Sequence, residues 1–472
     1  MVGITSLGAY IPIYRLNRNE IARIWGTKSL GGEKAVAGYD EDSLTMAVAA
    51  ANNAIETEID EIDGLFFATT TAPYKEKQSA AVIASAIDLD RRCYTSDLCN
   101  SLRTGTLAIR SAIDTVNSGS AGNIMVIASD CRMGAAQGRF EQLLGDGAAA
   151  LIIGSKDPIA LIEGTYSIFS EFTDIWRGQL DYFIRFVENR YATDVGYKPI
   201  MQEVISEIMK KYKLTPKDFS KIVFDGLEIK EHHRIAKKLG FEESQIIKPL
   251  SKDVGHTGSA SSILMLISCL EEASPGDRVL FASYGDGSDA FIFRITEHIE
   301  KIKKGTLRES LSKKIPIDYG KYLTWRNLVP EEVSTLPERP TLSLARRWRE
   351  RKSILALYGY KCKQCGTPQF SPLGQTSRVC VVCQAKDNFE EYKFSDKKGK
   401  IFTYSVDSLQ ATRNPPGLNG VVDFDGGGRL ICEVTDCEPD KIHVGMSVEM
   451  TFRMMFQSKG INNYFWKAKP II

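Results

Sequence analysis

The sequence of 472 residues contains no apolar stretch of the roughly 20 residues that cross a bilayer as a helix. It also has no excess of charge of one sign, since 60 Lys and Arg residues are matched by 59 Asp and Glu residues. Without a basic surplus, the composition does not point to nucleic acid or to an anionic membrane as a partner. The first residues, Met1 to Pro12, lack the basic start and apolar run of a signal peptide. We therefore expect a cytoplasmic protein that binds neither membranes nor nucleic acid.

Four cysteines in the last quarter of the chain form two C-x2-C pairs, Cys362 with Cys365 and Cys380 with Cys383. Each pair presents two thiolates to one ion, and two pairs complete the tetrahedral sulfur shell of a structural Zn²⁺. Two disulfides are the alternative, which a reducing cytoplasm disfavours. A closed shell of four sulfurs leaves no position for a substrate. The metal is therefore expected to fold its module and to take no part in chemistry.

Residues 1–297 contain one pattern twice. The first copy, residues 101–154, reads SLRTGTLAIRSAIDTV, a turn with GSAG, NIMVIASDCR and, after an insertion, GDGAAALIIG. The second copy, residues 257–295, reads TGSASSILMLISCLEEA, an SPG turn, DRVLFASY and GDGSDAFIFRI. Each copy predicts a helix of small residues followed by two apolar strands, with a further strand upstream at 64–69 or 221–225. The repeat predicts a duplicated α/β body whose sheet is covered on both faces.

This repeat, the opening VGITSLGAYIP and the segment DIWR (174–177) resemble the thiolase superfamily, and within it the hydroxymethylglutaryl-CoA synthases. The cysteine pairs, followed by KIFTYSVDS, GGGRLICEV and HVGMSVEMTF, resemble the DUF35-type zinc-ribbon and OB-fold proteins that accompany thiolase-like enzymes. The resemblance implies an α/β chain: a duplicated five-layered thiolase fold, then a rubredoxin-like zinc ribbon and an all-β OB-fold. It also implies an acyl-CoA substrate, and a homodimer or a dimer of dimers.

The expected domains follow from these two resemblances. They are a first thiolase-like half (1–160), a second half (161–297), a linker with a basic helix (298–358), the zinc ribbon (359–390) and the OB-fold (391–472). The basic helix offers side chains that could hold the phosphates of coenzyme A. These candidates are Arg346, Arg347, Arg349 and Lys352. Solvated charges on a helix face are the alternative for most of the basic residues in this linker.

The resemblance also implies a cysteine nucleophile at a helix N-terminus, where the helix dipole favours a thiolate. In this chain the corresponding segment is DLCNSLRTGT (97–106), and Leu102 occupies the position of the cysteine. Leucine cannot form a thioester, so an acyl-enzyme at this position is excluded. A displaced Cys99 and the hydroxyl of Ser101 are the alternatives for a nucleophile.

Other catalytic positions of the family also carry different residues here. The family's histidine, counted back from the AKKLG helix, falls on Asp225, and its asparagine falls on His256 in GHTGSAS. Its glutamate falls on Thr70, while Tyr284 lies on a loop that lines the pocket in relatives. Asp225 follows an apolar strand, where a carboxylate is costly unless it is exposed or paired. We expect Asp225 as a base and His256 as an oxyanion donor or proton shuttle, with Tyr284 and Thr70 as polar partners.

These substitutions predict chemistry on a thioester that needs no acyl-enzyme. We expect aldol or retro-aldol chemistry on a β-hydroxyacyl-CoA, with a ketone or an aldehyde as the second partner. One alternative is a hydroxymethylglutaryl-CoA synthase or thiolase reaction with a displaced nucleophile, and another is a non-catalytic subunit that presents coenzyme A esters. Two further histidines, His232 and His233, share a polar helix face with Arg234 and Lys237. We expect both at the surface.

Overall fold

The computed structural model describes residues 1–55, 61–226, 229–302, 306–330, 343–370 and 378–471. The chain forms two compact units. The α/β unit consists of Met1–Ala37, Asp42–Ala84 and Leu89–Tyr319, and the second unit of Gly38–Glu41, Ser85–Asp88 and Gly320–Ile472. Parts of the expected linker (303–305 and 331–342) and of the expected zinc ribbon (371–377) lie outside the described residues. No described helix has the length and apolar character that crossing a membrane would require.

The α/β unit is built on a nine-stranded sheet with the strand order β11-β12-β13-β8-β1-β7-β6-β4-β5. Its strands are β1 (Gly3–Tyr10), β4 (Gly64–Thr69), β5 (Tyr94–Cys99), β6 (Asn123–Asp130), β7 (Gly147–Gly154), β8 (Ala160–Phe169), β11 (Lys221–Phe224), β12 (Arg278–Tyr284) and β13 (Gly287–Ile295). Strands β6, β7 and β13 are buried along nearly their whole length, as their continuous apolar sequences predict.

The two halves of this sheet repeat one topology, which confirms the duplication predicted from the sequence. In the first half, helix α4 (Thr104–Asn117) precedes β6 and β7, which pair antiparallel, and β4 lies parallel to β6. In the second half, helix α9 (Ser261–Glu272) precedes β12 and β13, which also pair antiparallel, and β11 lies parallel to β12. The halves meet where β1 pairs with β8.

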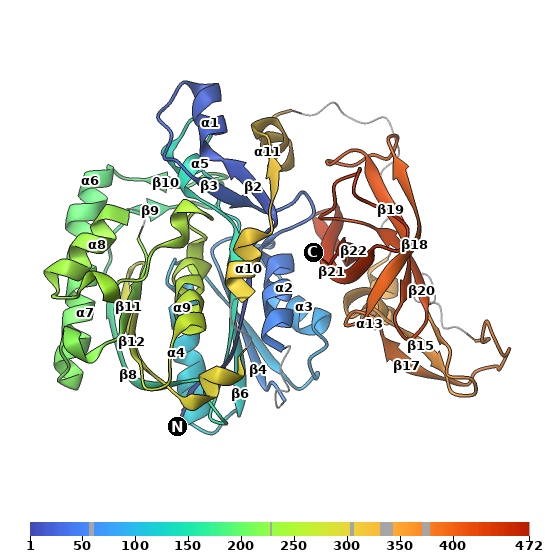
Figure 1. Ribbon diagram of the computed structural model, residues 1–472, viewed down its shortest axis with the longest axis horizontal. Helices are drawn as coiled ribbons and strands as arrows, with labels where there is room; N and C mark the ends of the chain where they lie inside the picture. Colours follow the sequence, from blue (N-terminus) through green and yellow to red (C-terminus); the bar gives the residue numbers. More distant parts are fainter. Residues whose placement is uncertain (56–60, 227–228, 303–305, 331–342, 371–377, 472) are drawn as a thin grey trace. The chain divides into compact units, whose positions relative to one another are not determined.

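The helices complete a five-layered arrangement (Figure 1). Helices α4 and α9 lie between the two halves of the sheet, α2 (Ser43–Ile55) covers the first half, and α7 (Lys198–Tyr212) and α8 (Ile229–Lys238) cover the second. Small residues allow the two central helices to approach closely. A Cβ atom at Gly105 would lie 2.8 Å from the Cδ1 atom of Ile263 and 2.9 Å from the backbone oxygen of Ser259.

Other elements of the chain up to residue 325 are shorter. They are β2 (Tyr14–Asn17), α1 (Arg18–Trp25), β3 (Glu33–Val36), α3 (Ser79–Ala86), α5 (Arg139–Leu143), β9 (Ile175–Trp176), β10 (Arg185–Phe186), α6 (Asn189–Tyr191), a π-helix (Ala192–Tyr197), α10 (Thr306–Ser312), β14 (Ile315–Ile317) and α11 (Tyr319–Trp325). Strand β14 pairs parallel with β2. Residues beyond the second repeat therefore belong to the α/β unit as far as Tyr319.

The second unit contains a small three-stranded sheet and a five-stranded one. After α12 (Leu344–Arg349) and α13 (Arg351–Leu355), strands β15 (Tyr358–Cys362), β16 (Pro368–Gln369) and β17 (Phe389–Lys393) form the small sheet. Strands β18 (Lys398–Asp407), β19 (Gly417–Phe424), β20 (Arg429–Glu433), β21 (Ser447–Ser458) and β22 (Ile461–Pro470) form the larger sheet in the order β20-β19-β18-β21-β22. A bridge between Val434 and Ala468 closes this sheet toward a barrel, as expected for an OB-fold.

Candidate active site

A cavity lies in the α/β unit where the repeated halves bring their strand ends and helix starts together. Its lining residues are Leu102, Phe140, Asp174, Ile175, Phe186, Val187, Asn189, Ala192, Thr193, Tyr197, Asp225, Gly226, His256 and Tyr284. Asp225 follows β11, Tyr284 ends β12, and Leu102 and His256 precede the two central helices. Carboxyl ends of strands are the usual location of ligand sites in α/β folds. The structure thus brings Leu102 and three of the four predicted catalytic residues together around one cavity.

The backbone on both sides of His256 requires glycine. The amide of His256 donates to the backbone oxygen of Leu143 at 2.8 Å. Gly255 has a φ angle of +91°, and a Cβ atom there would lie 2.7 Å from the backbone nitrogen of Gly145. Gly258 has a φ angle of +64°, which L-residues rarely adopt. The GHTG sequence therefore holds the imidazole in one place at the start of the α9 region.

His256 and Asp225 form a buried pair in which the Nε2 atom lies 3.3 Å from the Oδ2 atom. The backbone amide of Gly258 donates to the Nδ1 atom of the imidazole at 3.2 Å. Because Nδ1 accepts a hydrogen bond, the proton of the neutral ring resides on Nε2 and is directed at the carboxylate. The two side chains are only 7% and 10% exposed. This arrangement fits a proton-sharing pair better than a free oxyanion donor.

The surroundings of Asp225 keep its side chain ionised. Burial by itself would raise the pKa of Asp225, but hydrogen bonds from His256 and Ser261 lower it below its ordinary value. Asp225 is therefore a carboxylate throughout the neutral range. Because Asp225 and His256 are coupled, the two side chains can accept one proton as a pair.

A second hydrogen-bonded pair lines the same cavity. The hydroxyl of Tyr284 donates to the Oδ2 atom of Asp174 at 2.8 Å. Burial raises the pKa of Tyr284 and also that of Asp174. The phenol therefore keeps its proton and can act as a donor. Tyr197 joins the two pairs, because its ring lies 5.2 Å from that of Tyr284 and its hydroxyl donates to the backbone oxygen of Asp225 at 2.7 Å.

The position of the expected nucleophile lies in the cavity wall and is occupied by Leu102. Neither Cys99 nor Ser101 is among the described residues that line the cavity. Cys99 lies at the end of the edge strand β5, and partial desolvation together with the carboxylates of Asp97 and Asp130 raises the pKa of its thiol. A raised pKa makes the thiol a poorer nucleophile at neutral pH.

Thr70 lies beside a hydrogen-bonded cluster centred on Asp130. The Oδ1 atom of Asp130 accepts from the hydroxyls of Thr69 and Thr71 at 2.9 Å and from the amide of Thr70 at 2.7 Å. The Oδ2 atom accepts from the amide of Ser259 at 2.8 Å. Asp130 therefore joins the end of β4 to the start of the α9 region. Thr70 is not among the described residues that line the cavity, so its catalytic role remains a prediction.

The segment from residue 174 to residue 197 supplies more than half of the described lining and was not predicted from the sequence. It contributes Asp174, Ile175, Phe186, Val187 and Asn189 to the cavity, followed by part of the π-helix Ala192–Tyr197. A π-helix is rare and occurs often at functional sites. The segment has two short strands and no long periodic pattern, so periodicity could not reveal it.

His232 is buried, so its predicted surface position was wrong. Its side chain has no measurable exposure, and its ring stacks on Phe224 with centroids 4.2 Å apart. His233 is half-buried and lies 3.2 Å from the carboxylate of Glu243. The charged neighbours in the sequence suggested a solvated face, but α8 packs His232 against the last residue of β11. Burial lowers the pKa of His232 to about 4.

The buried ring predicts a loss of stability in mild acid. In the unfolded chain the histidine has its ordinary pKa of about 6.5 and is protonated below that pH, whereas the buried ring of the folded chain stays neutral. The free energy of unfolding therefore falls as the pH drops from about 6.5 toward 4. Between pH 7 and pH 5, His232 should lower the free energy of unfolding by about 2 kcal/mol. His232→Phe keeps the stacked ring and should lose that part of the dependence in urea unfolding of the full chain. The same change at the exposed His443 is the control, and equal pH dependence of both variants would contradict the assignment.

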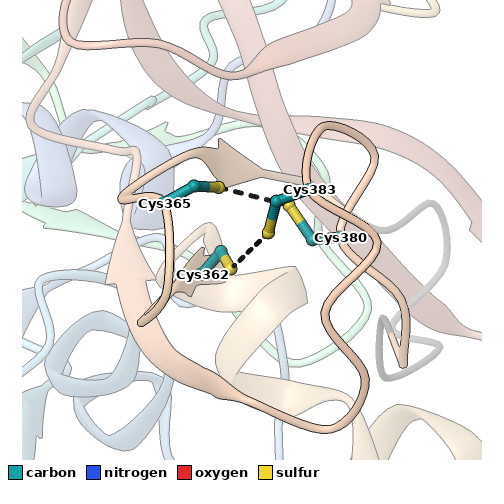
Figure 2. Close-up of side chains that lie close together, drawn as sticks. All are labelled: Cys362, Cys365, Cys380 and Cys383. Carbon is teal, nitrogen blue, oxygen red and sulfur yellow. Dashed lines mark hydrogen bonds between the residues drawn. The ribbon is translucent and has the colours of Figure 1, made fainter.

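The four cysteines of the second unit form one cluster (Figure 2). Their sulfur atoms all lie within 4.8 Å of one another, with Cys362 3.6 Å from Cys383 and Cys365 3.5 Å from Cys380. Disulfide sulfurs lie at about 2.05 Å, and all four cysteines are free, so the structure does not contain the two disulfides that were the alternative. Tetrahedral Zn–S bonds of about 2.3 Å place sulfurs about 3.8 Å apart, which matches the cluster. The set of four thiols therefore suits one zinc ion with no open position.

Metal removal should unfold the small sheet of the second unit selectively. Elemental analysis is expected to find one zinc per chain, and Cys365→Ser should lower that content. Treatment with a strong chelator should remove the hydrogen-exchange protection of the amides in β15 and β17, because structural zinc contributes directly to the folding of such modules. The amides of β6 should keep their protection. Cys99→Ser is the control, and protection of β15 in metal-free protein would contradict the zinc assignment.

The predicted coenzyme A cations lie on α12 and α13. Arg346 pairs with Glu350 at 2.9 Å, and Lys352 pairs with Glu391. Arg347 donates to the backbone oxygen of Asn462 at 3.2 Å, and Arg349 is exposed. A phosphate would compete with carboxylates for two of these four side chains. Their role in binding coenzyme A remains a prediction.

Curated relatives match the first two thirds of the chain. The hydroxymethylglutaryl-CoA synthase of Methanopyrus kandleri is 35% identical over 336 residues, which is 68% of this chain and 96% of the relative. The enzyme of the same name from Aeropyrum pernix is 36% identical over 336 residues, covering 68% of this chain and 92% of the relative. Each of these two alignments covers nearly the full length of the relative, so the similarity extends well beyond single motifs.

Domain and structure comparisons agree with both units. Residues 209–295 match the model described as 3-oxoacyl-[acyl-carrier-protein] synthase III C terminal, and residues 392–453 match the ChsH2 C-terminal OB-fold domain. A solved hydroxymethylglutaryl-CoA synthase in complex with CoA superposes with a TM-score of 0.63 at 20% identity, covering 68% of this chain and 89% of that one. This similarity confirms the thiolase-like fold of the α/β unit, and the second match confirms the OB-fold.

Proposed function

Because this chain belongs to the hydroxymethylglutaryl-CoA synthase family, we propose that it makes or breaks a carbon–carbon bond next to the thioester of an acyl-CoA. The specific reaction that we propose is an aldol or retro-aldol step on a β-hydroxyacyl-CoA, without an acyl-enzyme. One combined observation carries this proposal. Leu102 occupies the expected nucleophile position in the cavity lining, and the buried Asp225–His256 pair lines the same cavity.

The cleavage direction shows how the residues would act. Asp225, supported by His256, accepts the proton of the β-hydroxyl group, and the C2–C3 bond breaks as C3 becomes a ketone or aldehyde carbonyl. The electron pair moves onto the thioester as an enolate, whose oxygen is stabilised by a hydrogen-bond donor. Tyr284 keeps its proton and is our candidate for that donor, provided that its hydroxyl turns from Asp174 to the enolate oxygen when the substrate is bound. Protonation at C2 then yields the shorter acyl-CoA, so atoms and charge balance without another reactant.

Family membership favours a second candidate, a Claisen-type condensation like that named for the relatives. Such a reaction needs an acyl-enzyme, for which Cys99 and Ser101 are the nearest sequence candidates. Both lie outside the described lining of the cavity. We therefore place this reaction second. Mass spectrometry that maps an acyl group to either residue would establish it.

The direct test offers the protein a panel of β-hydroxyacyl-CoA thioesters. We expect release of a shorter acyl-CoA together with a ketone or aldehyde, quantified by liquid chromatography and by carbonyl derivatisation. A chain that binds these thioesters but cleaves none of them, and that forms none from acetyl-CoA and a ketone, would instead be a subunit that presents coenzyme A esters.

We also propose that the four-cysteine cluster holds structural zinc and that the chain forms a homodimer or a dimer of dimers. Light scattering would measure the mass of the assembly.

A further inference from the structure

The cavity has one apolar wall and one polar wall. Phe140 and Phe186 form much of the apolar wall, with ring centroids 4.7 Å apart. Phe140 is only 4% exposed and packs in a small core with Leu144 and Ile184, so this wall is fixed by the fold. The polar wall carries the two hydrogen-bonded pairs described above. A substrate whose reacting carbons contact the polar residues can place its remaining substituent against the two phenylalanines.

The charges on the lining are of one sign. Asp174 and Asp225 both line the cavity, and none of its described lining residues is a lysine or an arginine. Arg132 lies near both carboxylates, but it is buried and is not part of the described lining. A carboxylate on the substrate would therefore contact no guanidinium or ammonium group of the described lining, whose two carboxylates carry like charge. Burying an unpaired anion is costly, whereas an alkyl group gains from contact with the phenylalanines.

The size of the cavity limits the substituent further. The cavity volume is about 50 Å³. A single water needs about 10–15 Å³ on this measure, so there is room for only a few heavy atoms. Short alkyl groups fit this space, whereas a polycyclic group would have to extend past the exposed Phe186 toward solvent.

We propose that the substituent taken by this cavity beyond the β-carbon is short, uncharged and apolar, and that a terminal carboxylate is selected against. The inference rests on the proposed function for the identity of the substrate as a β-hydroxyacyl-CoA. The proposed substrates differ from 3-hydroxy-3-methylglutaryl-CoA, which carries a terminal carboxylate. In the cleavage direction the released carbonyl compound is then a small neutral ketone or aldehyde.

Two thioesters that differ at one end test the inference. The probes are 3-hydroxy-3-methylpentanoyl-CoA, which ends in a methyl group, and 3-hydroxy-3-methylglutaryl-CoA, which ends in a carboxylate. We expect the full chain to bind the neutral thioester at least tenfold more tightly in calorimetric titration, a difference of about 1.4 kcal/mol. We expect a ratio of kcat/KM that favours the neutral thioester by at least the same factor. Equal or tighter binding of the carboxylated thioester would overturn the inference.

Binding and cleavage separate the two proposals. Preferential binding of the neutral thioester without cleavage of either would refute the aldol reaction and leave the selectivity in place. Cleavage of both with equal kcat/KM would support the reaction and refute the selectivity.

A cation added to the apolar wall provides the matched variant. Phe186 is 47% exposed, so Phe186→Lys can be accommodated, and it should raise the affinity for the carboxylated thioester relative to the neutral one by at least tenfold. Phe169→Lys is the control, because Phe169 is 87% exposed and is not part of the described lining. If both variants changed the ratio of the two thioester affinities equally, the effect would come from general surface charge, and the inference would be wrong.

Discussion

Replacement of Asp225 by asparagine is expected to lower kcat for a β-hydroxyacyl-CoA substrate by about 10³-fold, within the range for loss of a general base. Asparagine has nearly the same shape and can still accept a hydrogen bond from His256, so the cavity should remain intact. What it cannot do is take up the proton of the β-hydroxyl group. Steady-state kinetics of acyl-CoA release, with KM measured separately, checks this expectation.

Asp157→Asn is the matched control for this variant. Asp157 is exposed and has a φ angle of +48°, which asparagine also tolerates, and it is not part of the described lining. Its kcat should stay within about threefold of the wild type, since removal of an exposed charge away from the reacting atoms has little effect. Equal losses in both variants, or full activity of Asp225→Asn, would contradict the role assigned to Asp225.

The same substitution should also change the dependence of stability on pH. The pKa of Asp225 is lowered in the folded chain, so its carboxylate adds stability above the unfolded pKa, and that stability is lost as the pH falls through the lowered value. Asparagine lacks this contribution. Wild type and variant should therefore differ more in melting temperature at pH 7 than near pH 3. This comparison separates a folding effect from the catalytic one.

Leu102→Cys is expected to produce the second large effect, a change from no covalent acylation to nearly one acyl group per chain. Position 102 lines the cavity and lies two residues before the 14-residue helix α4. The N-terminus of a helix favours a thiolate, and a thiolate attacks a thioester carbonyl. After incubation with acetyl-CoA, intact-protein mass spectrometry should show one added acetyl group.

Leu180→Cys is the control for unspecific acylation. Leu180 is 95% exposed and is not part of the described lining, so a thiol there should remain mostly unmodified under the same conditions. A folded Leu102→Cys variant that stays unmodified would show that the bound thioester does not reach this position. The assignment of position 102 as the expected nucleophile position would then be wrong.

Much of the architecture could be predicted because it depends on short-range patterns. The C-x2-C spacing alone predicted the cluster of Cys362, Cys365, Cys380 and Cys383, since each pair needs only a tight turn. The internal repeat predicted equivalent helices and strands. The family resemblance assigned Asp225 and His256 to catalytic positions, and the structure brings them to 3.3 Å.

The remaining features depend on long-range packing, which no local pattern shows. Asp174 and Phe186 enter the cavity from a segment without helical or strand periodicity. His232 has charged neighbours in the sequence, yet the packing of α8 against β11 buries it. The pairing of β14 with β2 likewise extends the α/β unit beyond the repeat, and no local sequence pattern predicts contact between two strands so far apart in the chain.

Intact-protein mass spectrometry of the wild-type chain during turnover tests the central claim most directly. The chain is mixed with a β-hydroxyacyl-CoA that it cleaves, the reaction is quenched at intervals, and the protein mass and the released acyl-CoA are measured together. We predict that the shorter acyl-CoA accumulates while the protein keeps its unmodified mass at every time point. An acyl adduct on Cys99, Ser101 or another residue, formed and consumed at the rate of turnover, would contradict the account.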